Sequence, residues 1–370
     1  MRIGIDARLH HYTQGGIARY ARRLIWALAR IDSTDQFVVL QSRHETDPIV
    51  EQANFRRYAA WTPPHHRLEQ LSLPLELTRL GLDLLHSVDF IPPFRRRCRA
   101  VITVHDLAFL LYPHLVTKES QRYYRQIRRA VASAEGIIAV SEATRQDMQR
   151  LLGVPPERVE VIHHAPDGHF QPLEDKTQVV QFCEQRGLPL GFLLWVGVIE
   201  PRKNLVTLLK ALALLKPHWP DGEPALVLAG RPGWLYQDTL QLIDQLRLSQ
   251  NVILFEPNST SDLLMLYNSA TIFVFPSLYE GFGFPPLEAM SCGTPVISSN
   301  TPSLAEVQGE AALYVDPLDE EAWAKTIQRL WNDAPLREEL SRRGLARASQ
   351  FTWRSTAEKT LNLYHKVAGG

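Results

Sequence analysis

The chain has 370 residues, of which 45% are hydrophobic and 22% charged, and its 40 basic side chains equal its 40 acidic ones in number. This length exceeds one ordinary hydrophobic core and the composition is that of a globular protein, so we expect two packed domains and exclude a disordered or fibrous chain. Three cysteines without a C-x-x-C pair exclude a disulfide framework and a cysteine zinc site.

The charge is distributed unevenly along the chain. Residues 1–165 carry 23 basic and 17 acidic side chains, and the remainder carries 17 and 23. A basic first half is suited to an anionic acceptor or a membrane surface, with a solvated face as the alternative, and we expect no nucleic-acid partner. No apolar run approaches the roughly 20 residues that cross a bilayer, and no apolar signal core begins the chain. We therefore expect a cytoplasmic protein, peripheral at most at the inner face of the membrane.

Short apolar runs alternate with stretches of helical period in the first half. Helices are predicted over 16–31 and 119–134, and polar residues 163–178 have the composition of a linker. Strands are predicted at RIGID (2–6), FVVL (37–40), LLHSV (84–88), AVITV (100–104), GIIAV (136–140) and VEVI (159–162).

A second series of the same kind follows the linker. Strands are predicted at FLLWVGV (192–198), ALVLAG (225–230), VILFE (252–256), TIFVFPS (271–277), PVISS (295–299) and ALYV (312–315). Two alternating series predict two doubly wound α/β domains, over residues 1–170 and 171–354. Because ligands of such sheets bind beyond the carboxyl ends of the strands, the residues that follow each strand are the candidate site.

Three features follow strands of the first half. Gly15 and Gly16 immediately precede a long helix, where bare backbone and a helix amino end suit an anion, although a plain turn explains them equally well. His105 follows a predicted central strand, at a position where substrates bind. Ser141 is placed to cap the next helix, and we interpret it as structural.

In the second half, two cations follow the first strand. Pro201 suits the start of a helix, which would place Arg202 and Lys203 in the first turn. Positive charge there opposes the helix dipole, so the pair is better explained by a bound phosphate than by folding, with a solvated surface as the alternative.

The loop YEGFGFPPLEAMSCGTPV follows the strand at 271–277. Pro285 and Pro286 predict a helix start, which would place Glu288 in the first helical turn, where an acid is favourable. Glu280 precedes any helix and has no such explanation. Little side chain shields the backbone amides of residues 281–284, so they can donate hydrogen bonds to ligand oxygens, and the carboxylates can accept from hydroxyls. The loop is therefore suited to a polyhydroxylated ligand with an anionic neighbour.

These segments together resemble the retaining glycosyltransferases of family four, which have the GT-B fold. The resemblance is carried by EGFGFPPLE, with its E-x7-E spacing, and by GVIEPRKNL, TVHDLAF, AVSEATRQDM and GGIARY, and it covers nearly the whole chain. It implies two Rossmann-like domains that face each other across a cleft. It also implies that the last helix, near 355–370, crosses back to the first domain.

The resemblance also implies roles for single residues. Arg202 and Lys203 would hold the donor diphosphate, and Glu280 would grip the transferred sugar. Val198 follows Gly197 where many members carry arginine, so we expect Arg202 to take that role. The remaining donor-binding and reacting-sugar contacts would come from Gly15, Gly16, His105, Asn258, Gly281, Phe282, Gly283, Phe284, Leu287 and Glu288, with Glu288 at the ribose, Asn258 near the base and His105 near the reacting sugar.

Family members transfer a sugar with retention of configuration, usually explained by same-face attack in which the leaving phosphate takes the proton. No metal or cofactor is implied, and the sequence has no D-x-D motif. EPRKN with SLYEGFGFPPLEAM resembles mannosyltransferases that use GDP-mannose, with UDP-glucose, UDP-N-acetylglucosamine or another UDP-sugar as the alternative donor. The acceptor would be a glycan or a lipid-linked saccharide.

Two other classes remain open from the sequence. A nucleotide-sugar 2-epimerase can share this architecture, and a non-catalytic subunit could bind the nucleotide sugar without turnover. Lipid contact is expected at FRRRCRA (94–100) and at a basic helix, with a solvated basic face as the alternative. The arginines of that helix are Arg122, Arg125, Arg128 and Arg129.

Overall fold

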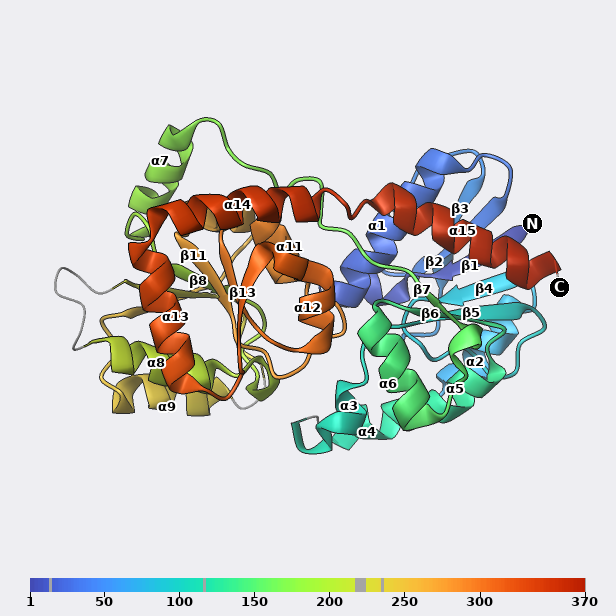
Figure 1. The fold of residues 1–370 in the computed structure, drawn as a ribbon. Helices are drawn as coiled ribbons and strands as arrows, with labels where there is room; N and C mark the ends of the chain where they lie inside the picture. Colours follow the sequence, from blue (N-terminus) through green and yellow to red (C-terminus); the bar gives the residue numbers. More distant parts are fainter. Residues whose placement is uncertain (13–14, 116–117, 217–223, 234–235, 370) are drawn as a thin grey trace. The chain divides into compact units, whose positions relative to one another are not determined.

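The protein divides into two compact units. The first comprises Met1–Ala165 and Thr352–Gly370, and the second Pro166–Phe351. The predicted division was 1–170 and 171–354, with the final helix assigned to the first domain. In each unit, helices flank a twisted parallel sheet (Figure 1). The computed structural model describes residues 1–12, 15–115, 118–216, 224–233 and 236–369.

The first unit contains a seven-stranded parallel sheet. Its strands, in spatial order, are β3 (Phe55–Ala60), β2 (Gln36–Ser42), β1 (Arg2–Asp6), β4 (Leu84–Ser87), β5 (Arg99–Val104), β6 (Gly136–Ala139) and β7 (Val159–Val161). The six strands predicted for this half are all present. β3 was not predicted, because FRRYAA has two arginines in place of an apolar run. As an edge strand it pairs only with β2, which leaves room for the charged side chains.

The helices of the first unit are α1 (Gly16–Ile31), α2 (Glu69–Leu77), α3 (Ala108–Leu111), α4 (Lys118–Tyr124), α5 (Ile127–Ser133), α6 (Glu142–Leu152) and α15 (Trp353–Gly369). The single helix predicted over 119–134 was wrong in one respect. The helix is interrupted between α4 and α5. There the backbone amide of Gln126 donates to the carbonyl of Tyr123, three residues back, whereas an α-helical amide donates to the carbonyl four residues back. Among the described residues, no helix is long and apolar enough to cross a membrane.

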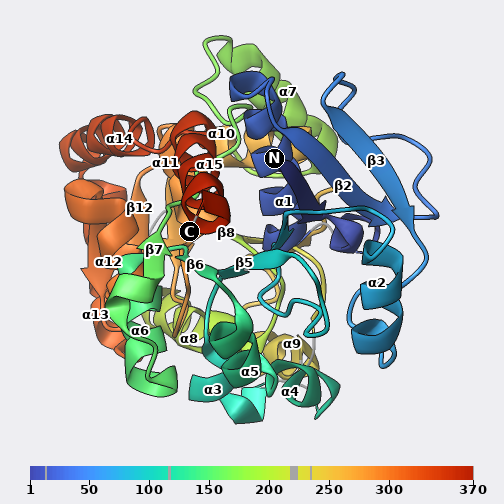
Figure 2. The same ribbon diagram turned by 90° about the vertical axis from the view of Figure 1, so that its right-hand side faces the viewer.

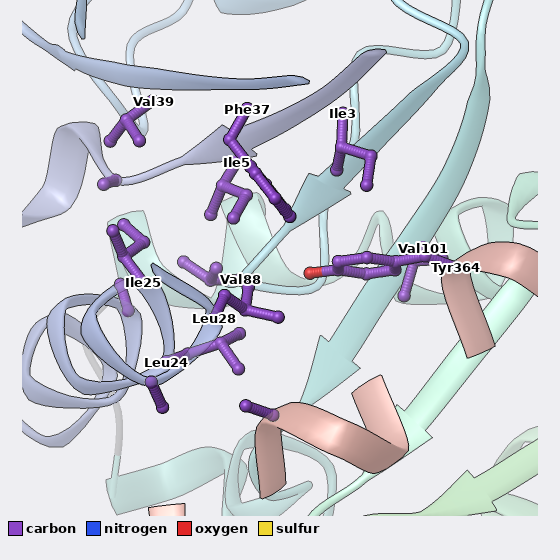
Figure 3. Packing of buried hydrophobic residues seen from close by; sticks show 14 of the residues in the cluster. Ile3, Ile5, Leu24, Ile25, Leu28, Phe37, Val39, Val88, Val101 and Tyr364 are labelled. Atoms are coloured by element: carbon purple, nitrogen blue, oxygen red, sulfur yellow. The ribbon is translucent and has the colours of Figure 1, made fainter. Parts of the chain in front are cut away.

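The C-terminal helix α15 completes the core of the first unit, which confirms that the last helix returns to the first domain. Its Tyr364 packs in one buried cluster with Ile3, Leu24 and Val101, from β1, α1 and β5 (Figure 3). The Tyr364 hydroxyl lies 2.6 Å from Nδ1 of the buried His86 on β4. Burial lowers the pKa of His86 to about 3, so this ring is neutral and needs both of its hydrogen bonds.

The second unit contains a six-stranded parallel sheet, and all six predicted strands are present. In spatial order they are β10 (Val252–Phe255), β9 (Leu226–Ala229), β8 (Leu193–Val196), β11 (Ile272–Phe275), β12 (Val296–Ser299) and β13 (Ala312–Val315). The helices are α7 (Lys176–Arg186), α8 (Leu205–Leu215), α9 (Tyr236–Gln245), α10 (Thr260–Ser269), α11 (Phe284–Ser291), α12 (Pro302–Gln308), α13 (Glu320–Asn332) and α14 (Ala334–Ala348).

Both sheets are doubly wound, and the strand order of each reverses at one place. This switch lies between β1 and β4 in the first sheet and between β8 and β11 in the second. The loops that leave two such strands diverge to opposite faces of the sheet, which opens a crevice at their carboxyl ends. In the second unit, these two loops carry the predicted cations and Glu280.

We expect Tyr364→Phe to destabilise the protein by about 1–3 kcal/mol, because it leaves Nδ1 of His86 buried without its partner. Urea unfolding followed by circular dichroism measures the change. Tyr12→Phe, at a tyrosine that is 50% exposed, is the matched control and should change the free energy of unfolding by less than about 0.5 kcal/mol. Equal effects of the two substitutions would contradict the structural role of α15.

Candidate functional site

The loop after β8 contains both predicted cations, but in a different conformation from the predicted one. Arg202 and Lys203 belong to a 3-10 turn, Pro201–Lys203, and α8 begins only at Leu205. Asn204 separates the 3-10 turn from α8, and its backbone adopts the left-handed conformation, with φ 55°. Its side chain donates to the carbonyls of residues 276 and 317. The prediction that the cations oppose the dipole of α8 in its first turn was therefore wrong.

The loop after β11 leads into α11, as Pro285 and Pro286 predicted. The helix begins at Phe284 with Gly283 as its N-cap, so Glu288 lies in the second turn and its predicted first-turn position was wrong. Gly283 has φ 92°, and a Cβ added there would lie 2.5 Å from Cδ2 of the buried Leu304. Only glycine fits this position without displacing that side chain.

The two loops meet through ionic contacts at the switch point. Lys203 Nζ lies 2.7 Å from Oε1 of Glu280, and Arg202 Nη1 lies 3.2 Å from its Oε2. Arg202 also donates to Glu200 Oε1 at 2.8 Å and to the Tyr279 carbonyl at 2.7 Å. The structure thus brings together the three residues that the sequence singled out on these two loops, Arg202, Lys203 and Glu280.

The pairing fixes the charge of Glu280. Burial opposes ionisation of Glu280, but the charges of Lys203 and Arg202 outweigh it and lower the pKa to about 2. Burial raises the pKa of Glu200, which Arg202 and Lys203 partly offset. Glu280 is therefore a carboxylate at neutral pH, and it can only accept hydrogen bonds.

Two fixed cations beside an ionised acid suit a ligand that has an anionic part and a hydroxylated part. The cations attract the anion, and the carboxylate accepts from hydroxyls next to it. The Nζ of Lys203 also lies 5.2 Å from the ring centroid of Phe275 at the end of β11, so the ammonium is held in one place. In such a preorganised site little reorganisation is needed as charge develops.

The other predicted donor-binding residues of this unit have surroundings of their own. Glu288 is buried and accepts from the Tyr267 hydroxyl at 3.0 Å, and Leu287 is fully buried. Asn258 is exposed in the loop after β10, where its backbone N–H donates to the Asp262 carboxylate. Gly281 and Phe282 are buried beside Glu280 in sequence.

In the first unit, Gly15 and Gly16 lie at the helix junction that the sequence predicted. α1 begins at Gly16, with Gly15 as its extended N-cap. One turn further, Tyr20 places its ring edge on His105, with the centroids 5.1 Å apart. The start of α1 and the carboxyl end of β5 therefore lie together. Ser141 accepts from the amide of Thr144, which confirms it as the N-cap of α6.

His105 is held in one orientation at the end of β5. Its Nε2 lies 2.8 Å from the Val88 carbonyl, and because a carbonyl only accepts, Nε2 carries the proton. Its Nδ1 lies 3.3 Å from Nε2 of the buried His164. Burial lowers the pKa of His105, partly opposed by the Val88 carbonyl, so the ring is neutral at pH 7.

Sequence reasoning missed four residues that shape these sites. Glu200 and Asn204 lie inside the EPRKN segment, which was recognised for its cations alone. Ser303, on α12, donates to the backbone carbonyl of Glu280 at 2.5 Å. His164 belongs to the segment interpreted as a linker. The signal for Asn204 was available, because asparagine is enriched in the left-handed conformation, whereas nothing local marks the others.

Family models match both halves of the chain. Residues 14–167 match the family described as Glycosyltransferase Family 4, and residues 187–347 match the one described as Glycosyl transferases group 1. O-antigen chain mannosyltransferase B of Escherichia coli is 35% identical over 282 residues, which cover 76% of this chain and 74% of that protein. The serotype-specific mannosyltransferase WbdA of Escherichia coli is 31% identical over 313 residues, which cover 80% of this chain but 38% of that protein.

Solved structures show the same fold over the full chain. Sucrose-phosphate synthase from Thermosynechococcus elongatus has a TM-score of 0.80 at 22% identity, over 100% of this chain and 99% of that one. HepE from Anabaena in complex with UDP-glucose has a TM-score of 0.76 at 19% identity, over 100% of both chains. The fold is therefore GT-B, as the sequence predicted.

We expect the stabilisation from Glu280 to depend on pH in one direction. Its carboxylate is favoured in the folded state, so the contribution is full above the ordinary pKa of 4.5 and is lost as pH falls toward about 2. Urea unfolding of wild type and Glu280→Gln should show a gap on the order of 3 kcal/mol at pH 7 that narrows below pH 4.5.

The matched control for this pH series is Glu320→Gln, at an acid that pairs with Lys210 at 2.6 Å but is about one-third exposed. Its effect should stay below about 1 kcal/mol at every pH. A gap for Glu280→Gln that does not change with pH would contradict the ionic pairing.

Proposed function

Because the chain belongs to glycosyltransferase family 4, we propose that it transfers a mannosyl unit from GDP-mannose to a glycan or lipid-linked saccharide in polysaccharide synthesis. The observation that supports this proposal most is the cluster of Arg202, Lys203 and Glu280 at the switch point of the second sheet. It combines fixed cations for a diphosphate with an ionised acceptor for sugar hydroxyls. The mannosyl group is proposed from the mannosyltransferases that the chain resembles.

In this proposal, each part of the second unit binds one part of the donor. Lys203 and Arg202 hold the diphosphate and stabilise the charge that grows on it as the bond to the sugar breaks. Glu280 accepts from the sugar hydroxyls, and the backbone amides of residues 281–284 donate to them. Glu288 would accept from the ribose, Asn258 would lie near the base, and Leu287 would be a further donor-binding residue.

The first unit supplies the remaining groups. Gly15 and Gly16 approach the phosphates, because the amino end of α1 favours an anion and bare backbone allows close contact. In this proposal His105 lies near the reacting sugar, where its neutral ring adds no charge. Its two nitrogens face the Val88 carbonyl and His164, so His105 positions the substrate by packing and does not exchange a proton with it.

We propose that the transfer retains the anomeric configuration and uses no metal. The bond between the anomeric carbon and the phosphate oxygen breaks, and the acceptor hydroxyl forms the new bond on the same face. The hydroxyl proton passes to the leaving phosphate oxygen, so no separate protein base is consumed. The two cations beside Glu280 take the charge-stabilising role.

A UDP-sugar, such as UDP-glucose or UDP-N-acetylglucosamine, is the second candidate donor. It is favoured by the likeness to HepE, whose structure holds UDP-glucose. An epimerase or a non-catalytic binding subunit would use the same cations for the nucleotide diphosphate. The experiment that follows separates all of these.

At equal concentrations, we expect GDP-mannose to stabilise the protein against heat more than UDP-glucose does. At 100 times its dissociation constant, GDP-mannose should raise the free energy of unfolding by about 2.7 kcal/mol over that of the ligand-free protein. Glu280→Gln should slow donor hydrolysis and transfer on the order of a hundredfold, while the affinity for GDP stays within about threefold. Lys203→Ala should weaken both hydrolysis and GDP binding. Lys210→Ala, at the exposed lysine paired with Glu320, is the control and should change neither.

Each contrary outcome has a distinct meaning. If UDP-glucose stabilises the protein and GDP-mannose does not, the donor is a UDP-sugar. Isomerisation of the sugar nucleotide without an acceptor would indicate an epimerase, and binding without hydrolysis or transfer would indicate a non-catalytic subunit. Wild-type hydrolysis by Lys203→Ala would contradict the phosphate role of the cluster.

A further inference from the structure

Helix α2 of the first unit exposes a stripe of leucines. Leu68, at its N-cap, is 55% exposed, and Leu71 and Leu75 are 58% and 70% exposed. Spacings of three and four residues place them on one face of the helix. The opposite face is buried through Leu73 and Leu77, which pack in a small core cluster of the first unit. Figure 2 shows α2 at the outer rim of this unit.

Trp61 extends the apolar stripe beyond the end of α2. It is 69% exposed, and its amide donates to the Glu76 carboxylate at 2.9 Å, which fixes it beside the last turn of the helix. The Arg43 guanidinium lies 4.5 Å from the centroid of its indole ring. An exposed tryptophan with an arginine on its ring is apolar on one side and charged on the other.

The exposed charges around the stripe are basic. Arg67 and Arg79, at either end of α2, are both exposed. The acids of residues 61–79 are Glu69 and Glu76. Glu69 is buried against Arg8, at 2.5 Å, and Glu76 accepts from the backbone amides of residues 61 and 62. Glu69 is therefore paired below the surface, whereas Glu76 keeps its charge but is half-buried, and it offsets only part of the positive charge of the exposed Arg43, Arg67 and Arg79.

Helix α2 also contacts the basic segment 94–97, through a residue outside the stripe. The Gln70 side chain of α2 accepts from the Phe94 amide at 2.9 Å and donates to the Pro92 carbonyl at 3.2 Å. The Arg129 guanidinium lies 4.1 Å from the centroid of the Phe94 ring. Arg95, Arg97, Arg122 and Arg125 of the first unit are also exposed.

Part of the predicted basic surface has a structural task instead. Arg96 pairs with Glu135 at 2.9 Å, and Arg99 bonds to the carbonyl of Val367 on α15. Arg128 donates to the Leu151 carbonyl at 2.9 Å. These three arginines are therefore held by protein acceptors, and the exposed arginines at the ends of α2 are Arg67 and Arg79.

We infer that the leucine stripe of α2, with Trp61, inserts into the surface of a bilayer that contains anionic lipid. Leu68, Leu71 and Leu75 would enter the acyl boundary, and the arginines around them would contact the lipid phosphates. We choose a bilayer over a protein partner because of charge. A protein partner would need acidic side chains around an apolar groove, whereas an anionic bilayer has negative headgroups above an apolar interior everywhere on its surface. This inference does not depend on the proposed transfer reaction.

Flotation of the full-length protein with lipid vesicles tests the inference. Wild type should float with vesicles of phosphatidylglycerol and phosphatidylcholine and much less with phosphatidylcholine alone. Leu71→Ser with Leu75→Ser should weaken binding on the order of tenfold or more, because both side chains would no longer be buried in lipid. Leu190→Ser with Leu318→Ser, at leucines of the second unit that are 65% and 70% exposed, should float as wild type does.

Two controls keep the outcome distinct from misfolding and from the proposed function. The thermal midpoint and GDP binding of the α2 variant should equal those of wild type, since both leucines are exposed. Undiminished flotation of the α2 variant, or no flotation of wild type, would overturn the inference. So would a wild-type dimer that the α2 variant converts to a monomer without any vesicle binding, since the stripe would then bind a second copy.

Discussion

The ion pairs of Glu280 with Lys203 and Arg202 hold together the two loops at the switch point of the second sheet. Strands β8 and β11 are neighbours, but their connections run in opposite directions, so nothing in the sheet itself joins their loops. The two ion pairs join them, together with bonds to the backbone: the Leu278 amide donates to the Arg202 carbonyl at 3.0 Å, Arg202 donates to the Tyr279 carbonyl, and Asn204 donates to the carbonyl of residue 276. The position of each cation depends on Glu280, and the charge of Glu280 depends on the cations.

This mutual dependence changes how the proposed roles relate to one another. The sequence suggested separate tasks, with the cations for a diphosphate and Glu280 for a sugar. In the structure the two positive charges balance Glu280 and the buried Glu200, so a diphosphate would share cations that the acids already hold. Removing one member therefore alters the others, and single substitutions report on the cluster as well as on the residue.

The first unit has a comparable support beneath His105. The Tyr20 ring touches His105, and its hydroxyl lies 3.1 Å from that of Thr103, which in turn lies 2.8 Å from Nε2 of His86. Tyr364 of α15 closes this chain of hydrogen bonds at the other nitrogen of His86. The C-terminal helix thus contributes Tyr364 to the hydrogen-bonded side chains that support Tyr20 and His105.

Much of this arrangement could be predicted from the sequence, because parallel strands buried on both faces read as continuous apolar runs. Twelve such runs were strands, whereas β3 escaped because an edge strand tolerates Arg56 and Arg57. The helix starts at Leu205 and Phe284 were misplaced, since they depend on Asn204 and Gly283 in left-handed conformations. The partners of the cations could not be predicted, because contacts between distant loops leave no periodic signal in one sequence.

The measurement that tests the account most directly is a double-mutant cycle of Lys203→Ala and Glu280→Gln, read as GDP affinity by calorimetry. If the two residues act as one cluster, Lys203→Ala should weaken binding strongly in the wild-type background, because it leaves the Glu280 carboxylate facing the phosphates. In the Glu280→Gln background, Lys203→Ala should weaken GDP binding much less, so that the coupling energy between the two substitutions is at least about 1 kcal/mol. Additive effects, or GDP affinity that Lys203→Ala leaves unchanged, would contradict the cluster as the donor site.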